Sequence, residues 1–183
     1  MSTAVVIPLK QFSRAKSRLR LDGALDVTAI VEGLARGVVI AAKPRPVIIV
    51  SEDDDLAAFA DSLHVELLLS RSTTLNEALQ SAYLELSDRF THLIIAHGDL
   101  RFPGGLGAVD VESGITLYGD HRGEGTNVMV LPTNLDFRFA YGPNSLARHI
   151  EEAQRLRIAT RVELESPWRF DVDEPDDLSA SPT

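Results

Sequence analysis

The sequence of 183 residues contains no cysteine, so disulfide bonds and thiolate metal sites are excluded. This absence fits a reducing cytoplasm. No apolar run approaches the roughly 20 residues that a helix needs to span a bilayer, and the N-terminus lacks the basic-then-apolar order of a secretory signal. The net charge of −9 argues against general binding to nucleic acid, which usually needs a basic face. We therefore expect a cytoplasmic protein that binds neither membranes nor nucleic acid.

Several common catalytic signatures are absent as well. There is no Walker loop, no Gly-x-Gly-x-x-Gly fingerprint and no Gly-x-Ser-x-Gly elbow, which disfavours kinases and dehydrogenases of the usual types. None of the five histidines has zinc-site spacing to another. His97 lies two positions before Asp99, and we expect it to support a site there by a hydrogen bond rather than by proton transfer.

What the sequence does contain is the pattern of a single α/β domain. Hydrophobic residues make up 44% of the chain, which suits one domain with a sizeable core. Four apolar runs alternate with helical patterns, at residues 4–7, 47–50, 65–69 and 91–96. This alternation predicts a mostly parallel sheet with helices on both faces. The second half is less regular: strands are expected at 115–118, 126–131 and 162–164, a helix after Ser145, and a frayed tail at 179–183.

A concentrated positive stretch follows the first apolar run, which Pro8 is expected to end. Its five cations occur within twelve positions and without an intervening acid, although the chain carries 27 acidic and 18 basic residues. They are Lys10, Arg14, Lys16, Arg18 and Arg20. A strand that leads into such a loop suits a polyanion, with a nucleoside triphosphate as the leading candidate and a solvated basic turn as the alternative. Because ligands bind outside the carboxyl ends of parallel strands, we expect this loop and Asp99 at one edge of the sheet.

Three carboxylates are candidates for a metal site. Asp99 directly follows an apolar strand, and Asp171 and Asp173 alternate with apolar residues in an extended pattern, which places them on one side about 6–7 Å apart. Aspartate is depleted in strands, so such a pair calls for a reason. Mg²⁺ is one, because it prefers oxygen ligands. The alternative is that Asp173 or Glu174 caps a helix beginning at Pro175, which leaves Asp171 unexplained.

Two further segments offer groups that bind anions. Residues 125–127, Gly-Thr-Asn, precede a predicted strand, and residues 142–145, Gly-Pro-Asn-Ser, precede a predicted helix. Exposed N–H groups at a helix N-terminus attract anions. The simpler interpretation is that Asn144 or Ser145 only caps the helix.

Taken together, these motifs resemble the 2-phospho-L-lactate guanylyltransferase family, including its phosphoenolpyruvate-using relatives, which act in biosynthesis of the deazaflavin coenzyme F-420. The motifs that carry the resemblance, in order, are Pro8-Leu-Lys10, Ala15-Lys-Ser-Arg-Leu19, Asp99-Leu100, Gly125-Thr-Asn127, Gly142-Pro-Asn-Ser145 and Asp171-Val-Asp-Glu-Pro-Asp-Asp-Leu178. The resemblance implies that residues 1–183 form one domain with the Rossmann-like, three-layer α/β/α nucleotidyltransferase fold, similar to molybdenum-cofactor guanylyltransferases.

The resemblance also implies a reaction and roles. The phosphate of phosphoenolpyruvate or 2-phospho-L-lactate attacks GTP, and pyrophosphate leaves. A phosphate oxygen is ionised at neutral pH and needs no general base, so catalysis is mainly alignment and charge neutralisation. The residues implied to hold the triphosphate are Lys10, Lys16 and Arg18. Those implied to hold one or two Mg²⁺ ions are Asp99, Asp171 and Asp173. Those implied to bind the phosphorylated three-carbon acid are Thr126, Asn127, Gly142 and Ser145.

The chain departs from the family pattern at three places. Arg101 replaces a usual proline, His97-Gly98 replaces small residues, and residues 139–143 read Phe-Ala-Tyr-Gly-Pro where Phe-Gly-Pro is common. An altered acceptor pocket is therefore one interpretation. Two other functions remain: a nucleotidyltransferase acting on a molybdopterin or sugar phosphate, against which the Pro-Leu-Lys opening argues, and a non-catalytic nucleotide-binding module, against which the three aspartates argue. Edge strands of this fold often pair, which leaves a homodimer open.

Overall fold

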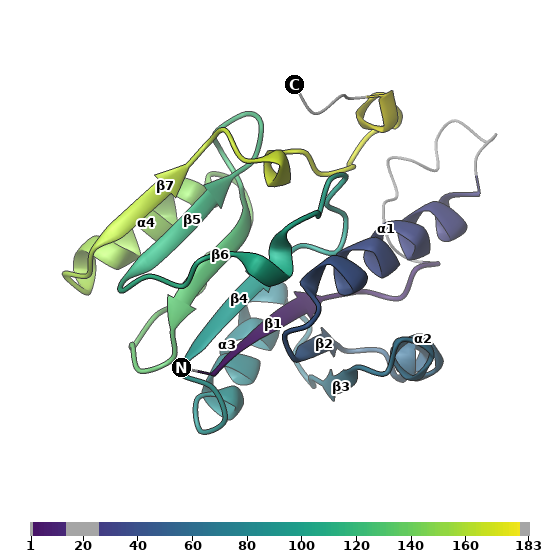
Figure 1. Cartoon of the computed structure of the whole chain (residues 1–183), viewed down its shortest axis with the longest axis horizontal. Helices are drawn as coiled ribbons and strands as arrows, with labels where there is room; N and C mark the ends of the chain where they lie inside the picture. The colour runs from purple at the N-terminus through teal and green to yellow at the C-terminus, as the bar shows by residue number, and fades with distance from the viewer. Residues whose placement is uncertain (1, 14–25, 180–183) are drawn as a thin grey trace.

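A seven-stranded sheet forms the centre of the protein (Figure 1). The computed structural model describes residues 2–13 and 26–179. The strands are β1 (Thr3–Pro8), β2 (Val47–Ser51), β3 (Glu66–Leu69), β4 (His92–Ala96), β5 (Ile115–Gly119), β6 (Thr126–Pro132) and β7 (Thr160–Glu163). Their order across the sheet is β3-β2-β1-β4-β6-β5-β7. The predicted strands are confirmed, with β1 including Pro8 and with β7 beginning two residues earlier than expected.

The direction of β6 distinguishes it from the other strands of the described sheet. The β1 strand is parallel to β2 and β4, β2 is parallel to β3, and β5 is parallel to β7. The β6 strand is antiparallel to both of its neighbours, β4 and β5. The expectation of a mostly parallel sheet is therefore confirmed. Because β6 is reversed, its first residues lie at the edge where the other strands end.

Helices cover both faces of the sheet, as the alternating pattern predicted. They are α1 (Val27–Ala42), α2 (Ala57–Leu63), α3 (Leu75–Leu86) and α4 (Ser145–Arg155), with short 3-10 turns η2 (Asp54–Leu56), η3 (Leu106–Ala108), η4 (Pro167–Arg169) and η5 (Pro175–Ser179). The α1 and α2 helices pack with η3 on one face, while α3 and α4 pack on the other. This is the expected three-layer α/β/α arrangement. The expected frayed tail lies outside the described residues, apart from Ser179 at the end of η5.

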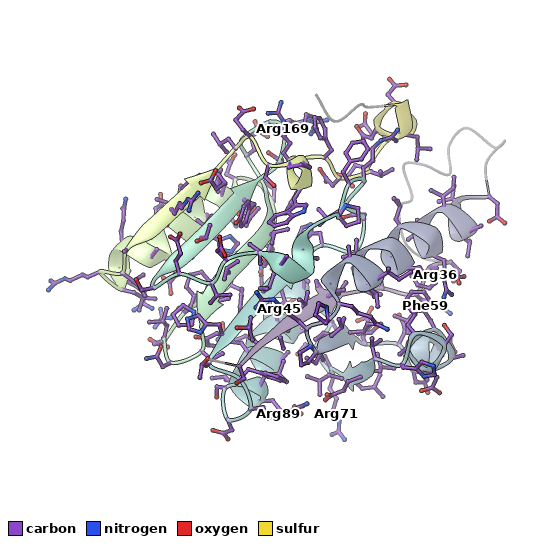
Figure 2. The ribbon with its side chains drawn as sticks, viewed as in Figure 1. Arg36, Arg45, Phe59, Arg71, Arg89 and Arg169 are labelled. Carbon is purple, nitrogen blue, oxygen red and sulfur yellow. The ribbon has the colours of Figure 1, made fainter. Side chains whose placement is uncertain are left out.

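Alternating side chains of β1 divide the core into two layers. Val5 and Ile7 face the α1 side, and Ala4 and Val6 face the α3 side, because successive residues of a strand point to opposite faces. On the α1 side, the Arg36 guanidinium lies over the Phe59 ring of α2, 5.2 Å from its centroid (Figure 2). The sheet is therefore packed on both faces.

Two helices begin with a side-chain cap. The Asp26 carboxylate accepts a hydrogen bond from the Ala29 N–H at the start of α1, and the Thr74 hydroxyl accepts one from the Glu77 N–H at the start of α3. Each cap satisfies an N–H group that the helix itself leaves without a partner. None of the helices in the described part of the chain has the length and apolarity that crossing a membrane requires.

Candidate active site

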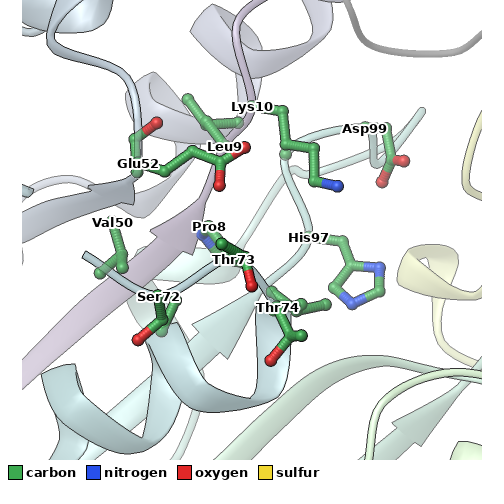
Figure 3. A pocket seen from close by; sticks show the side chains of 14 residues that line it. Pro8, Leu9, Lys10, Val50, Glu52, Ser72, Thr73, Thr74, His97 and Asp99 are labelled. Carbon is green, nitrogen blue, oxygen red and sulfur yellow. The ribbon is translucent and has the colours of Figure 1, made fainter. Parts of the chain in front are cut away.

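A pocket of about 250 Å³ lies at the edge where β1, β2 and β4 end. Lys10, Glu52 and Asp99 line it just beyond these strands, and residues 72–74 line it from the segment between β3 and α3. In Figure 3 the Lys10 ammonium, the His97 ring and the Asp99 carboxylate lie on the same side of the pocket. The prediction that the basic loop and Asp99 lie at one edge is confirmed for Lys10, whereas the other four cations of the loop lie outside the described residues. Residues 72–74 were missed because a Ser-Thr segment is also typical of an ordinary loop.

Gly98 lies against the side chain of Leu9. A Cβ atom at this position would lie 2.2 Å from Cδ2 of Leu9, so this end of a flexible side chain would have to move. The other nearest atoms would lie at 3.5 Å or more, which is ordinary contact. Sequence analysis treated the His97-Gly98 pair as a departure from the family pattern, and the structure places its glycine beside Leu9.

The three aspartates predicted as metal ligands lie together. Asp99, Asp171 and Asp173 each present a carboxylate oxygen, and these oxygens all lie within 4.8 Å of one another. Burial raises the pKa of the Asp171 carboxyl, and the negative charges of Asp99 and Asp173 raise it further. A divalent cation would relieve this crowding, and an all-oxygen set of carboxylates matches the preference of Mg²⁺. The residues therefore fit the predicted metal.

A short antiparallel contact brings these aspartates together from distant parts of the sequence. Leu100 and Asp171 form an isolated β-bridge. The Val172 N–H donates to the Asp99 carbonyl at 3.1 Å, and the Arg101 N–H donates to the Phe170 carbonyl at 2.9 Å. These hydrogen bonds join the backbone that follows β4 directly to the C-terminal segment.

Asp177 fixes the backbone at Asp173. Its Oδ2 accepts hydrogen bonds from the N–H groups of Asp173 at 2.8 Å and Glu174 at 2.7 Å. The Nη1 of Arg101 donates to the Asp177 carbonyl at 2.8 Å. Arg101 therefore links the turn at residues 173–177 to the loop that carries Asp99. The carboxylate that accepts from these two N–H groups belongs to Asp177, and the interpretation of Asp173 or Glu174 as the cap of the helix at Pro175 stays a prediction.

Asn127 connects β6 to the acidic cluster. Its Nδ2 donates to the Trp168 carbonyl at 3.0 Å and to Oδ1 of Asp171 at 3.3 Å. The second bond favours the ionised form of Asp171 and lowers its pKa, opposing the effect of burial. Asn127 is only 2% exposed, so its amide orients Asp171 from within the protein.

The other residues predicted to bind the acceptor form a second group. The Thr126 N–H donates to the Ser145 hydroxyl at 3.0 Å, and the Ser145 N–H donates to the Gly142 carbonyl at 3.1 Å. Gly142 has a φ of +117°, which favours glycine. The interpretation that Asn144 or Ser145 caps the helix is correct for the position of Asn144, which is the N-cap of α4. Asn144 adopts a left-handed conformation there, and its side chain makes no capping bond.

His149 holds the Thr126 side chain in place. Its Nε2 accepts a hydrogen bond from the Ala140 N–H at 3.0 Å, so Nδ1 carries the proton and donates to the Thr126 hydroxyl, also at 3.0 Å. Burial lowers the pKa of His149 to about 4, which keeps the ring neutral near pH 7. Sequence analysis missed this role, although Ser145 and His149 are four residues apart and share a helix face.

The predicted site residues that the structure describes therefore form two groups, which Asn127 links. The structure brings Lys10 to Asp99, joins Asp99 to Asp171 and Asp173, and links that cluster through Asn127 to Thr126. Thr126, Gly142 and Ser145 are mutually bonded. Lys16 and Arg18 lie outside the described residues.

Several known proteins are similar to this chain over most of its length. The family model described as "Guanylyl transferase CofC like" matches residues 3–180. The phosphoenolpyruvate guanylyltransferase of Roseiflexus castenholzii is 31% identical, over 97% of this chain and 87% of its own. The 2-phospho-L-lactate guanylyltransferase of Methanothermobacter thermautotrophicus is 29% identical, over 97% of this chain and 83% of its own.

The fold is shared with a solved structure of a nucleotidyl transferase from Methanothermobacter. It superimposes with a TM-score of 0.64, covering 97% of this chain and 94% of that chain at 16% identity. The resemblance inferred from the ordered motifs is confirmed. The chain belongs to the CofC-like guanylyl transferase family and has a nucleotidyltransferase fold.

Proposed function

We propose that the protein transfers GMP from GTP to the phosphate of phosphoenolpyruvate or 2-phospho-L-lactate, a step that the resemblance assigns to coenzyme F-420 biosynthesis in the cytoplasm. A phosphate oxygen of the acceptor bonds to the α-phosphorus of GTP. The bond from that phosphorus to the oxygen of the β-phosphate breaks, and pyrophosphate leaves with the electron pair. The observation that carries the proposal is the meeting of Lys10 with Asp99, Asp171 and Asp173 at one edge of the sheet.

In this proposal GTP occupies the pocket at the ends of β1, β2 and β4. Lys10 neutralises charge on the triphosphate and on the departing pyrophosphate, in a cleft where hydroxyl groups of residues 72–74 are also present. Lys16 and Arg18, eight residues or fewer further along the chain, are proposed to assist Lys10. No group has to remove a proton, which agrees with the lack of an acid–base pair in the motifs.

The carboxylates of Asp99, Asp171 and Asp173 are proposed to hold one or two Mg²⁺ ions. Bound there, Mg²⁺ supplies positive charge to the phosphates that meet at the site. The chain's own contribution is positional: Asn127 orients Asp171, and Asp177 fixes the backbone of Asp173. The exposed Asp173 leaves one side of the cluster accessible to substrates.

The acceptor is proposed to bind at Thr126, Asn127, Gly142 and Ser145. The support for this placement is the hydrogen bond from Asn127 to Asp171, which makes Asn127 a neighbour of the acidic cluster. The hydrogen bond from the Thr126 N–H to the Ser145 hydroxyl brings Thr126 and Ser145 to the start of the same strand.

One assay tests this function against its alternatives. The protein is incubated with Mg²⁺, each nucleoside triphosphate in turn, and phosphoenolpyruvate, 2-phospho-L-lactate, 3-phosphoglycerate or a sugar phosphate, and pyrophosphate is measured. We expect release with GTP and a phosphorylated three-carbon acid. Release only with a sugar phosphate would support a different acceptor class, and no release with any pair would support a nucleotide-binding module.

A homodimer through an edge strand is a separate proposal. The β7 edge carries the partly exposed side chains of Val162 and, just beyond it, Leu164, which a second copy could cover. Analytical ultracentrifugation tests this arrangement: the proposed dimer should dissociate when Val162 is replaced by lysine, and a monomeric wild-type protein would contradict it.

A further inference from the structure

The pocket at the ends of β1, β2 and β4 has charged side chains at two separate places. In Figure 3 Lys10 and Asp99 lie on one side of it, and Glu52 lies on the other, where β2 ends. The proposed function uses Lys10 and Asp99 at the phosphates of the nucleotide and gives no role to Glu52. A carboxylate in a pocket for a polyanion weakens binding by repulsion unless another part of the ligand offers it hydrogen-bond donors.

The backbone on both sides of Glu52 is held by hydrogen bonds. The buried hydroxyl of Ser51 accepts from the Asp53 N–H at 3.1 Å, which closes a short turn around Glu52. Oδ2 of Asp53 accepts from the Gln11 N–H at 3.1 Å, so this turn is joined to the segment that follows β1. Within residues 2–13 and 26–179, the Glu52 carboxylate itself makes no hydrogen bond or ion pair. Its two oxygens are therefore available to a molecule that enters the pocket.

Apolar side chains make this pocket suitable for a flat ring. Those that line it from β1, β2 and α3 are Pro8, Leu9, Val50, Leu75 and Ala78. The Ser70 N–H donates to the Ser51 carbonyl at 2.7 Å, so the segment that leads into α3 is joined to the strand end that carries Glu52. Apolar walls favour burial of the faces of a ring, and a few polar groups then fix its orientation. A nucleobase with one edge toward Glu52 satisfies both conditions.

Guanine matches a carboxylate better than the other bases do. An ionised carboxylate only accepts hydrogen bonds, and it does so with two adjacent oxygens. The Watson–Crick edge of guanine has two adjacent donors, N1–H and the 2-amino group. Adenine and cytosine place an acceptor nitrogen next to their amino group, and uracil has one donor between two carbonyl oxygens. A carboxylate therefore obtains a pair of charge-assisted hydrogen bonds from guanine, and meets a lone pair on the edge of each other base.

We propose that Glu52 determines the specificity for the base, with its two carboxylate oxygens accepting from N1–H and the 2-amino group of guanine. The inference rests on the proposed function, because it takes the triphosphate to lie beside Lys10. The base then occupies the apolar part of the pocket, and the ribose connects it to the phosphates on the Lys10 side. Adenine, cytosine and uracil nucleotides are rejected because each leaves an oxygen of Glu52 facing an acceptor.

Inosine triphosphate gives the decisive comparison, since it differs from GTP only by lacking the 2-amino group. Isothermal titration calorimetry with Mg²⁺ and without an acceptor measures the Kd of each nucleotide. The wild-type protein should bind GTP roughly 10-fold more tightly than inosine triphosphate, the size expected for one hydrogen bond to a charged group. Glu52→Ala should weaken GTP binding roughly 10- to 100-fold and remove the difference between the two nucleotides. Its melting temperature should not change, because Glu52 is exposed.

Asp54→Asn is the matched control. Asp54 is exposed two residues further along the chain and does not line the pocket, so this variant removes the same charge nearby without removing a contact to the base. It should keep the wild-type ratio of the two Kd values. A carboxylate at position 52 that acted only through its charge would give a different result for Glu52→Ala: both nucleotides would bind more tightly, because repulsion of their phosphates is reduced. That result would overturn the proposal.

The outcomes separate this base site from the function on which it rests. If the wild-type protein shows the expected preference for GTP but releases no pyrophosphate with any acceptor, the proposed transfer fails and the base site stands. If the wild-type protein turns over GTP and Glu52→Ala keeps the wild-type preference over inosine triphosphate, the base site alone is wrong. Equal Kd values for the two nucleotides in the wild-type protein would likewise contradict the base site.

Discussion

Residues 3–96 and residues 97–179 build the same site by different means. In the first region, parallel strands alternate with helices. The residues that follow β1, β2 and β4 line the pocket because these strands end at the same edge of the sheet. In the second region, the positions of Asp99, Asp171 and Asp173 depend on a short backbone contact and on side chains that bond backbone groups.

This difference indicates which part of the site should tolerate substitution of single side chains and which part should be sensitive to it. A strand end in the first region is held by ladder hydrogen bonds and two core layers, so no single side chain sets its place. In the second region individual groups such as the Asp177 carboxylate and the Asn127 amide set the positions of metal ligands. Outer partners of this kind commonly change metal affinity by 10- to 100-fold. Substitutions in the two regions should therefore have different signatures.

The largest effect is expected at a metal ligand. Asp173→Ala should lower kcat roughly 100- to 1,000-fold, because one carboxylate of the charge-neutralising site is lost. The fold should remain intact, since Asp173 is exposed. Glu174→Ala, at the exposed neighbouring position, is the control and should retain turnover. A cooperative thermal transition measured by circular dichroism confirms folding; loss of that transition would mean that Asp173 has a structural role instead.

The second-largest effect is expected at Asp177, which lies in the second region and positions a metal ligand without contacting a substrate. Asp177→Ala removes the acceptor for the Asp173 and Glu174 N–H groups. The Mg²⁺ concentration needed for half-maximal rate should rise roughly 10- to 100-fold, while the KM for GTP changes little. Asp177→Asn keeps one oxygen acceptor and should restore part of the affinity. An unchanged Mg²⁺ dependence in both variants would show that the turn is positioned by other contacts.

A smaller effect is expected for a cation at a strand end. Lys10→Ala should raise the KM for GTP about 10-fold, because one charged hydrogen bond to the triphosphate is lost. Lys16→Ala should act in the same direction. Lys43→Ala provides the comparison: its Nζ donates to the Leu63 carbonyl away from the pocket, so the KM should not change. Equal KM values for wild type and Lys10→Ala would remove Lys10 from the triphosphate site.

The smallest effect on activity is expected where the two regions are tied together structurally. Arg45, labelled in Figure 2, donates from Nε to the Gly107 carbonyl at 2.8 Å and from Nη2 to the Val109 carbonyl at 2.7 Å. Arg45→Ala should lower the free energy of unfolding by about 1–3 kcal/mol in urea titrations, because two buried carbonyls lose their partner. Turnover should persist; a large loss of kcat would show that this tie also positions the site.

Much of the first region could be predicted from the sequence, because its apolar runs are short and well separated. The rule that ligands meet the carboxyl ends of parallel strands then placed Lys10 and Asp99 together correctly. Thr74 and Glu77 likewise have the spacing of a capping box, and the Thr74 hydroxyl accepts from the Glu77 N–H as that spacing predicts. These features depend on local sequence.

The second region could be predicted only in part. Hydrophobic periodicity gave the location of β6 but carries no information on direction, so its antiparallel insertion between β4 and β5 was not foreseen. Asn144 is the N-cap of α4 without a capping bond from its side chain, and its left-handed conformation, which Asn tolerates, could not be read from the sequence. The contact of His97 with Tyr141 joins residues 44 positions apart, and no local pattern records it.

The reversed strand has a consequence for how this site can vary. Thr126 and Asn127 are adjacent on β6, so their side chains leave opposite faces: one toward His149, the other toward Asp171. A slip of β6 by a single residue would exchange the two faces, whereas a slip of two would preserve them. The pairing of β5 and β6 already shifts between Tyr118 and Gly119, next to Thr126. An insertion or deletion in the hairpin before β6 that shifts this strand by an odd number of residues would therefore disrupt the site. A shift by an even number would leave both side chains on their present faces.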